Sequence, residues 1–277
     1  MPTMIDAGVS IVIPAYNEGA NIRRVVEDVY AFLRANFPDF EIIVVDDGSR
    51  DDTVACLESL VSTIPLKIVR NPGNKGKGYS VKSGVMRAEK DFVLFCDADL
   101  STPLKELIGF FDHFAAGYDI VIGSRAMPDS RLAVKQGFLR RSMGKTFNFF
   151  LRVLLFGGIR DTQCGFKCFK RGQARRLFAL QTIDRFCFDA EVLFIARRLG
   201  LKIKEAGVEW RNRSDSRVAI IKDSFNMFAD LFRIRINAWR GVYDSVKAEG
   251  GAGVLAGPGV RGDAGKVPAA GPQKTLL

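Results

Sequence analysis

Short apolar runs alternate with helical patterns over the first 125 residues of the chain. The runs cover residues 10–13, 41–45, 66–69, 92–96 and 119–122. An apolar run of this length is typical of a strand that is buried on both faces of a parallel sheet. Helices between successive strands form βαβ units with right-handed crossovers. The pattern therefore predicts an α/β fold with a mostly parallel sheet flanked by helices.

Helices are predicted between these strands and again in the second half of the chain. After the first strand, apolar side chains recur at helical spacing at Ile22, Val25, Val26, Val29 and Phe32. A turn and short strand at 161–169, a helix at 189–199 and a strand at 203–210 complete the expected fold.

Polar clusters follow four of the predicted strands, at the point where each strand ends. They cover residues 14–18, 46–49, 97–101 and 123–125. The carboxyl ends of parallel strands meet at one edge of a sheet, where such folds bind ligands. We therefore expect these clusters to converge and to form a ligand site.

Two carboxylates stand at the end of the fourth strand, in Asp97-Ala98-Asp99. Such a pair can hold a hard divalent cation against a phosphate-bearing substrate, which predicts a metal and pyrophosphate site. Alternatively, the tripeptide caps a helix that begins near Pro103, because Asp and Ser are common residues at helix starts. The convergence of the other polar clusters favours the metal site.

Two later segments, residues 138–156 and 221–240, combine apolar side chains with arginines. The first is too charged to cross a bilayer and too apolar for an ordinary surface helix. The second, as a helix, would gather one apolar face from Ile221, Phe225, Phe228, Phe232 and Trp239. Most amphipathic helices pack on a core, but the flanking arginines of both segments favour attachment to a membrane surface.

The composition sets bounds on domain organisation and partners. One domain is expected over residues 1–247, followed by a disordered Gly-, Ala- and Pro-rich tail at 248–277. The net charge of +10 is compatible with nucleic acid, anionic lipid or a phosphorylated substrate. The sequence has no uncharged apolar run of about 18 residues, so no membrane span is expected.

The five cysteines lie mostly inside apolar stretches, as buried thiols do in a reducing compartment. Cys164 and Cys168 have a spacing that zinc sites use, but the chain has no second pair and its one histidine is His113. A zinc-thiolate site is therefore not expected.

Several motifs together resemble the family 2 glycosyltransferases, which have the Rossmann-like GT-A fold. They are residues 9–18 (VSIVIPAYNE), residues 44–49 (VVDDGS), Asp97-Ala98-Asp99 and Gly123-Ser124-Arg125. Residues 160–167 (RDTQCGFK), residues 188–191 (FDAE) and the Ser216-Arg217 turn resemble its dolichyl-phosphate β-glucosyltransferase branch and related polyprenyl-phosphate glycosyltransferases. The similarity covers residues 9 to about 240 in consistent order.

The resemblance implies a nucleotide-sugar site formed by Pro14, Ala15, Tyr16, Glu18, Val45, Asp46, Asp47, Asp97, Ala98, Arg125 and Arg217. Asp47, with Asp46 beside it, would hold the nucleotide, since a carboxylate can accept from the uracil ring N–H. Asp97 and Asp99 would bind Mg²⁺ or Mn²⁺, which neutralises the leaving diphosphate, and Arg125 would contact phosphate. Considered as residues alone, Asp46 and Asp47 could instead cap a helix, and a loop arginine such as Arg217 is usually just solvated. Arg217 also departs from the Lys of relatives, which changes its geometry.

The resemblance also implies a polyprenyl-phosphate acceptor, whose ionised oxygen is already a nucleophile. Single displacement would then convert an α-linked donor into a β-linked product. Asp161 would orient this acceptor, act as a base, or only fix the turn before Gly165. The candidate catalytic residues are therefore Asp99, Arg125 and Asp161. Arg140 and Arg141 would bind the lipid phosphate or form a solvated helix face.

The expected activity is metal-dependent transfer of glucose from UDP-glucose to dolichyl or another polyprenyl phosphate. Relatives often carry a transmembrane helix, so here peripheral attachment to the cytoplasmic face of a membrane would depend on the two amphipathic segments. One alternative is a family 2 transferase that uses GDP-mannose, another donor or a non-lipid acceptor. Another is a basic nucleotide- or nucleic-acid-binding module. Nucleic acid is not expected, because the aromatic residues follow helical core spacing instead of alternating with basic ones.

Overall fold

The computed structural model describes residues 5–128, 130–132, 151, 155, 157–211 and 220–244. In this part of the chain the strands are β1 (Val9–Ala15), β2 (Phe40–Asp46), β3 (Leu66–Arg70), β4 (Phe92–Cys96), β5 (Ile120–Ser124), β6 (Arg131–Leu132), β7 (Phe166–Lys170), β8 (Ile203–Gly207) and β9 (Glu209–Trp210). The helices are α1 (Ile22–Asn36), α2 (Thr53–Glu58), α3 (Lys77–Val85), α4 (Glu106–Ala115), α6 (Arg171–Leu180), α7 (Phe188–Arg198) and α8 (Ile220–Trp239). Every strand expected before residue 125 is confirmed.

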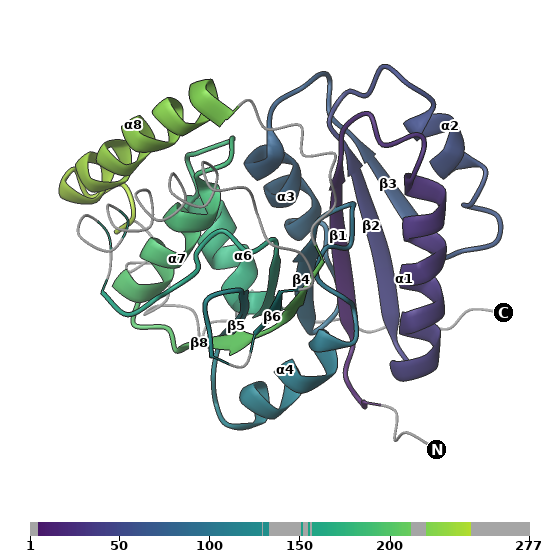
Figure 1. Ribbon diagram of the computed structural model, residues 1–277, viewed down its shortest axis with the longest axis horizontal. Helices are drawn as coiled ribbons and strands as arrows, with labels where there is room; N and C mark the ends of the chain where they lie inside the picture. Colours follow the sequence, from purple (N-terminus) through teal and green to yellow (C-terminus); the bar gives the residue numbers. More distant parts are fainter. Residues whose placement is uncertain are drawn as a thin grey trace, which may run out of the picture. The chain divides into compact units, whose positions relative to one another are not determined.

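The main sheet has seven described strands in the order β3-β2-β1-β4-β7-β5-β8 (Figure 1). The pairs β1/β2, β1/β4, β2/β3 and β5/β8 are parallel, while β7 runs antiparallel to both β4 and β5. All strands of this sheet except β7 therefore point the same way. A short parallel pair, β6 and β9, lies apart from it. The predicted mostly parallel α/β fold is confirmed.

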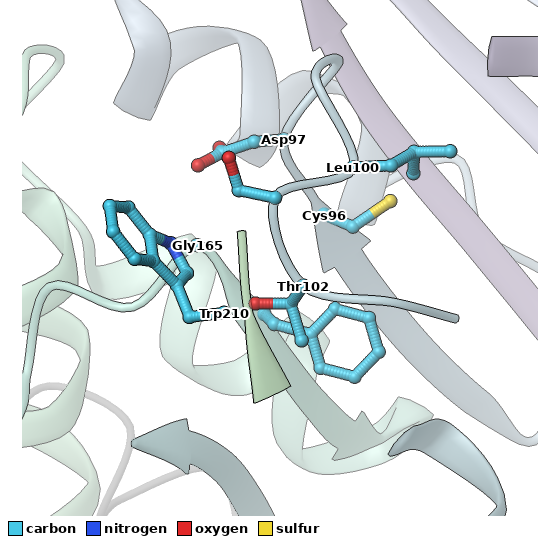
Figure 2. A pocket seen from close by; sticks show the side chains of 8 residues that line it. Cys96, Asp97, Leu100, Thr102, Gly165 and Trp210 are labelled. Atoms are coloured by element: carbon cyan, nitrogen blue, oxygen red, sulfur yellow. The ribbon is translucent and has the colours of Figure 1, made fainter. Parts of the chain in front are cut away.

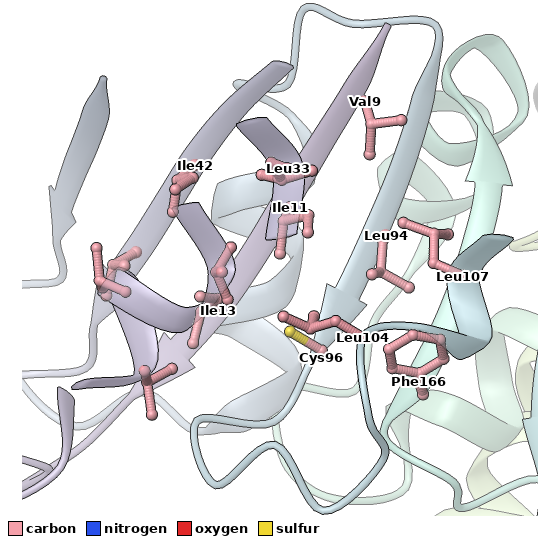
Figure 3. Packing of buried hydrophobic residues seen from close by; sticks show 14 of the residues in the cluster. Val9, Ile11, Ile13, Leu33, Ile42, Leu94, Cys96, Leu104, Leu107 and Phe166 are labelled. Atoms are coloured by element: carbon pink, nitrogen blue, oxygen red, sulfur yellow. The ribbon is translucent and has the colours of Figure 1, made fainter. Parts of the chain in front are cut away.

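One face of the sheet is covered by α1, α2 and α4. Figure 3 shows Ile11 of β1, Ile42 of β2 and Leu94 of β4 beside Leu33 of α1 and Leu107 of α4. Because successive strand residues point to opposite faces, alternate side chains of β1, β2 and β4 form this core.

The other face of the sheet is covered by α3, α6 and α7. The Phe95 ring of β4 lies 5.6 Å from the Phe188 ring of α7 and 6.3 Å from the Phe169 ring of β7. Phe169 in turn packs edge-on against Phe178 of α6. Aromatic contacts thus join α6 and α7 to the centre of the sheet.

Two details of the helices differ from the sequence pattern. Leu33, not Phe32, completes the buried face of α1, and Phe32 is partly buried beside Phe37. Helix α6 was not expected, because its polar first turns leave only Ala174, Leu177 and Phe178 as a short apolar repeat before its end.

The packed face of α8 also differs from the expected one. Leu231, Ile234 and Ala238 are buried, whereas Phe232 and Trp239 are 56% and 80% exposed. Phe232 and Trp239 of the predicted apolar face are therefore not packed on the core, and the membrane attachment of that face stays a prediction. The side chains of Ile221 and Phe225 lie outside the described part.

Of the segment 138–156, the structure describes only Leu151 and Leu155, which are both buried. The predicted tail at 248–277 lies wholly outside the described residues. Within the described helices, none combines the length and the apolarity that crossing a membrane requires.

A buried carboxylate fastens the end of the described chain to α7. Glu191 accepts hydrogen bonds from the backbone N–H groups of Thr182 and Ile183, at 3.0 and 2.8 Å. Its other oxygen accepts from the Thr182 hydroxyl at 2.6 Å and from the Tyr243 hydroxyl at 2.7 Å. Asn237 of α8 donates to the same Thr182 hydroxyl oxygen at 3.1 Å. Four donors thus satisfy a carboxylate that is fully buried.

Gly84 lies where α3 crosses β1 and β2, and a Cβ there would be 2.4 Å from Val12 Cγ1 and 3.0 Å from Val45 Cγ2. We expect Gly84→Ala to lower the free energy of unfolding by about 1–3 kcal/mol, because the added methyl overpacks the interface. Gly109 of α4 is the matched control, since a Cβ there meets nothing within 4 Å. Gly109→Ala should raise stability by roughly 0.5–1 kcal/mol. Urea unfolding followed by circular dichroism measures both, and equal shifts would contradict the close approach of α3.

Candidate functional site

The predicted nucleotide residues of β1 and β2 lie next to one another at the carboxyl ends of these strands. Pro14 pairs in register with Val45, and Ala15 pairs with Asp46. The Asp47 backbone N–H donates to the Ala15 carbonyl at 2.8 Å, which extends the pairing by one residue. This part of the expected convergence is confirmed.

Neither Asp46 nor Asp47 caps helix α2, which begins at Thr53 after the N-cap residue Asp52. Asp46 accepts from the Ser49 backbone N–H, at 3.2 and 3.3 Å from its two oxygens. Asp47 is buried and holds the loop before α3: it accepts from Asn71 Nδ2, the Lys75 N–H and the Gly76 N–H at 2.8, 3.0 and 2.8 Å.

The loop after β1 is fastened to the loop after β2. The backbone N–H groups of Asn17 and Glu18 donate to the hydroxyls of Ser49 and Thr53, at 2.8 and 2.7 Å. Asn17 has φ of 53°, a left-handed conformation that asparagine tolerates. The side chains of Tyr16 and Glu18 are partly exposed at this edge of the sheet.

A small pocket opens beyond the end of β4, lined in part by Asp97, Ser101, Gly165 and Trp210. Figure 2 shows the Asp97 carboxylate and the Trp210 indole on the same side of this pocket, while Leu100 points the other way.

Asp99 shapes the pocket loop and does not cap the next helix. Its carboxylate accepts from the Ser101 N–H at 2.8 Å and from the Ser101 hydroxyl at 2.7 Å. Helix α4 begins only at Glu106, and its N-cap residue Lys105 makes no side-chain cap. Ala98, between the two carboxylates, is buried.

Asp97 is held between a lysine and a glycine. Its Oδ1 lies 2.6 Å from Nζ of Lys77, the first residue of α3. A Cβ on Gly165 would lie only 2.1 Å from Asp97 Oδ2, so only glycine at 165 leaves room for this carboxylate. The Asp97 N–H also donates to the Gly165 carbonyl at 3.2 Å. These contacts fix the carboxylate at the floor of the site.

A second ion pair, near the Lys77–Asp97 pair, is fully buried. Lys167 Nζ of β7 lies 2.6 Å from Asp189 Oδ1 of α7 and 2.5 Å from the Cys164 carbonyl oxygen. Burial raises the pKa of Asp189, and Lys167 and Lys77 oppose this shift only in part. For Lys77, burial lowers the pKa, but Asp97, Asp189 and Asp99 outweigh it and raise the value.

Arg125, directly after β5, is clamped by Asp161. Arg125 Nε and one terminal nitrogen donate to the two Asp161 oxygens at 2.7 and 2.9 Å, and the Arg125 backbone N–H donates at 2.9 Å. The guanidinium also lies over the Trp210 ring, 5.5 Å from its centroid. Burial alone would raise the pKa of Asp161, but Arg125 holds it below its usual range. Asp161 also accepts from the Gln163 N–H at 3.1 Å, so it fixes the turn before Gly165.

Electrostatic coupling joins the Arg125 pair to the carboxylates after β4. Asp97 contributes to the raised pKa of Arg125, although burial opposes that shift and Asp161 is the nearer partner. We call Lys77, Lys167, Asp97, Asp99 and Asp189 the charge cluster. Its three carboxylates and two ammonium groups leave one formal negative charge, a setting that suits a cation.

The structure does not describe Arg140, Arg141 or Arg217, so their predicted roles stay predictions. The sequence reasoning gave no role to Lys77, Lys167 or Trp210, which all lie in or beside the site. The one local signal for Lys77 was its position in the glycine-rich segment 73–78, which leads into a helix.

The donor set of this site fits a divalent cation that substrate helps to bind. No cluster of three metal-ligating His, Cys, Asp or Glu side chains is present among the described residues. Asp97 and Asp99 can supply carboxylate oxygens, and Mg²⁺ commonly takes one or two carboxylates plus waters and substrate phosphates. Among the described residues, the four buried cysteines are not part of any cluster of three metal-ligating side chains. Burial also raises the pKa of the Cys164 thiol to about 11.

Comparison with known proteins agrees with this geometry. A model of the glycosyl transferase family 2 matches residues 10–178. The chain is 35% identical to the dolichyl-phosphate beta-glucosyltransferase of Dictyostelium discoideum, over 84% of this chain and 76% of that protein. It is 31% identical to the enzyme of the same description from Saccharomyces cerevisiae, over 84% and 76% of the two chains.

Solved structures show the same fold. A glucosyl-3-phosphoglycerate synthase from Mycobacterium tuberculosis in complex with UDP matches with a TM-score of 0.62 at 22% identity, over 82% of this chain and 80% of that one. The same enzyme with Mn²⁺, UDP-glucose and phosphoglyceric acid matches with a TM-score of 0.61, over 82% and 79%. The strand-end carboxylates, the parallel sheet and the family match lead to one conclusion: the chain is a glycosyltransferase and belongs to glycosyl transferase family 2.

Proposed function

We propose that this enzyme transfers glucose from UDP-glucose to dolichyl phosphate or a related polyprenyl phosphate, with inversion at the anomeric carbon. The observation that carries the proposal is the 31–35% identity to dolichyl-phosphate beta-glucosyltransferases over 84% of the chain. The position of Asp97 in the pocket beyond β4, and of Arg125 over Trp210 of the same pocket, supports it. Glucose as the transferred sugar is supported by the names of these relatives, and UDP-glucose as its donor by the UDP-glucose complex of a protein with this fold.

Asp46 is the better partner for the uracil ring N–H. Among described residues, it accepts only the Ser49 N–H and keeps lone pairs available. Asp47 already accepts three hydrogen bonds from the loop before α3. We therefore assign Asp47 to positioning that loop, and Pro14, Ala15, Tyr16, Glu18, Val45, Ala98 and Arg217 to the remaining surface around the nucleotide sugar.

Asp97 and Asp99 would hold Mg²⁺ or Mn²⁺ against the diphosphate of the donor. When bound, the cation supplies positive charge that stabilises the leaving diphosphate. Asp99 is held in place by Ser101, and Asp97 by Gly165 and Lys77, so the protein orients both carboxylates in advance.

Arg125 supplies a further cation at the same edge, and Asp161 positions it. In the reaction, an oxygen of the acceptor phosphate forms a bond to the anomeric carbon, while the bond from that carbon to the diphosphate oxygen breaks and UDP leaves. The acceptor oxygen carries no proton at neutral pH, so no base is required. The lowered pKa and the clamp on Arg125 make Asp161 a positioning residue instead of a base. Arg140 and Arg141 stay our candidates for the lipid phosphate.

The outer surface of α8 provides a contact with the membrane that contains the acceptor. Phe232, Ile236 and Trp239 are exposed on it, and the exposed Arg233 and Arg240 lie close by in sequence. Aromatic and aliphatic side chains beside arginines suit the interface of a bilayer that contains anionic lipid. We propose peripheral binding through this surface, on the cytoplasmic face where nucleotide sugars are present.

A donor panel tests the proposed activity. Purified enzyme is incubated with dolichyl phosphate and with radiolabelled UDP-glucose, UDP-galactose or GDP-mannose, and the label in the lipid fraction is counted. We expect a lipid product from UDP-glucose that requires Mg²⁺ or Mn²⁺ and is lost with a chelator. A lipid product from GDP-mannose alone would refute the proposed donor, and absence of any lipid product would refute the acceptor.

Removing a carboxylate ligand tests the metal assignment. We expect Asp99→Asn to lower kcat/KM for UDP-glucose at least about hundredfold, because the leaving diphosphate loses its neutralising partner. Asp112→Asn, on the exposed side of α4, removes the same charge outside the site and should leave turnover unchanged. Wild-type activity of Asp99→Asn at saturating Mn²⁺ would show that this carboxylate is dispensable.

Membrane binding is tested by flotation with phosphatidylserine-containing vesicles. We expect the double variant Phe232→Ser, Trp239→Ser to float several-fold less than the wild type, with an unchanged melting temperature, because both side chains are exposed. Val61→Ser, Met86→Ser is the control, since these side chains are 48% and 41% exposed elsewhere on the molecule. Equal flotation of the two double variants would assign membrane binding to another surface.

A further inference from the structure

We propose that Lys77 competes with the divalent cation for Asp97, so that the cation binds weakly until the nucleotide arrives. The inference depends on the proposed use of Asp97 as a metal ligand and adds an order of binding to it. The observation behind it is the ion pair between Lys77 Nζ and Asp97 Oδ1, 2.6 Å long and only partly exposed to water.

The ammonium group and a metal ion require the same oxygen. The Lys77 ammonium already occupies one side of Asp97 Oδ1, the oxygen through which this carboxylate would hold a cation, and two cations side by side there would repel each other. Asp97 cannot turn freely to offer another direction, because its carboxylate lies against Gly165, whose Cβ would be 2.1 Å from Oδ2. Binding of the metal ion therefore requires that Lys77 move.

The backbone of Lys77 is fixed, so only its side chain can move away. The preceding Gly76 N–H donates to Asp47 at 2.8 Å, and the following Tyr79 N–H donates to the Asp184 carbonyl at 3.0 Å. A Cβ on Gly76 or Gly78 would lie 2.5 or 2.7 Å from carbonyl oxygens of residues 183–184, which shows how closely this end of α3 packs.

A displaced Lys77 side chain still has acidic neighbours. Asp189 and Asp99 also act on its charge, and together with Asp97 they raise its pKa despite burial. Cation binding at Asp97 is weakened by Lys77 in two ways. The close Lys77–Asp97 contact is lost, and the Lys77 ammonium repels the bound cation. A bound diphosphate offsets this weakening, because its oxygens add ligands for the metal ion.

Mn²⁺ binding to the nucleotide-free enzyme provides the test, monitored by electron paramagnetic resonance of the free ion. We expect Lys77→Met to tighten Mn²⁺ binding at least about fivefold, the lower end of typical coupling between sites. Lys75→Met is the matched control: it removes the same charge two residues away, from an exposed side chain, and should leave Mn²⁺ affinity unchanged. Lys77→Gln, which keeps a donor for Asp97 but no charge, should tighten Mn²⁺ binding as well, and circular dichroism verifies the fold of each variant.

Adding UDP gives a second readout. In the wild type, UDP should tighten Mn²⁺ binding strongly, and in Lys77→Met this gain should shrink, because the competitor is already absent. Unchanged or weaker Mn²⁺ binding by both Lys77 variants, with Asp97→Asn abolishing binding in the presence of UDP, would overturn the inference and leave the proposed metal site intact. Absence of Mn²⁺ binding by every form of the enzyme, with and without UDP, would overturn both.

Discussion

The site depends on how the fold compensates the partly buried carboxylates at the end of β4. An ionised carboxylate removed from water is costly unless it is paired and hydrogen-bonded. Lys77 at the start of α3 supplies this pairing for Asp97, while Lys167 of β7 pairs with Asp189 of α7, which also acts on the Lys77 charge. Glycine at 165 lets Asp97 lie directly against the backbone just before β7. The antiparallel insertion of β7 beside β4 thus places both Gly165 and Lys167 next to the site.

The acidic residues of the site differ in role because their surroundings differ. Asp161 is buried but tightly paired with Arg125, so its pKa is low and it stays ionised. Asp189 is buried with weaker compensation, and its pKa is raised. Asp97 lines the pocket, and both Asp97 and Asp99 are only partly buried. Reaction at this edge therefore uses fixed charges more than proton transfer, which agrees with an acceptor that is already an anion.

Local periodicity and strand direction were enough to predict the sheet and one part of the site. The strands before residue 125 and the convergence of Ala15, Asp46 and Asp97 required only buried apolar runs and the geometry of parallel sheets. Lys77 and Asp97 are twenty residues apart, and Lys167 and Asp189 twenty-two, so no local pattern indicates either pair. The packed face of α8 could not be read from its sequence for a related reason. Apolar side chains occur on more than one side of this helix, and only the tertiary structure shows that Leu231, Ile234 and Ala238 are buried while Phe232 and Trp239 are exposed.

One loop links the surface helix to the charge cluster. Residues 182–185 lie between α6 and α7, and Glu191 holds the backbone of Thr182 and Ile183 at one end of this loop. The carbonyl of Asp184 then accepts from Tyr79, next to Lys77, at the other end. Because Tyr243 donates to the same Glu191, the segment after α8 and the start of α3 share one support. A chain of satisfied buried hydrogen bonds is stiff, since each broken member leaves an unpaired polar group in the interior. The segment after α8 and the backbone at the start of α3 are therefore connected through one series of buried hydrogen bonds around Glu191 and Asp184.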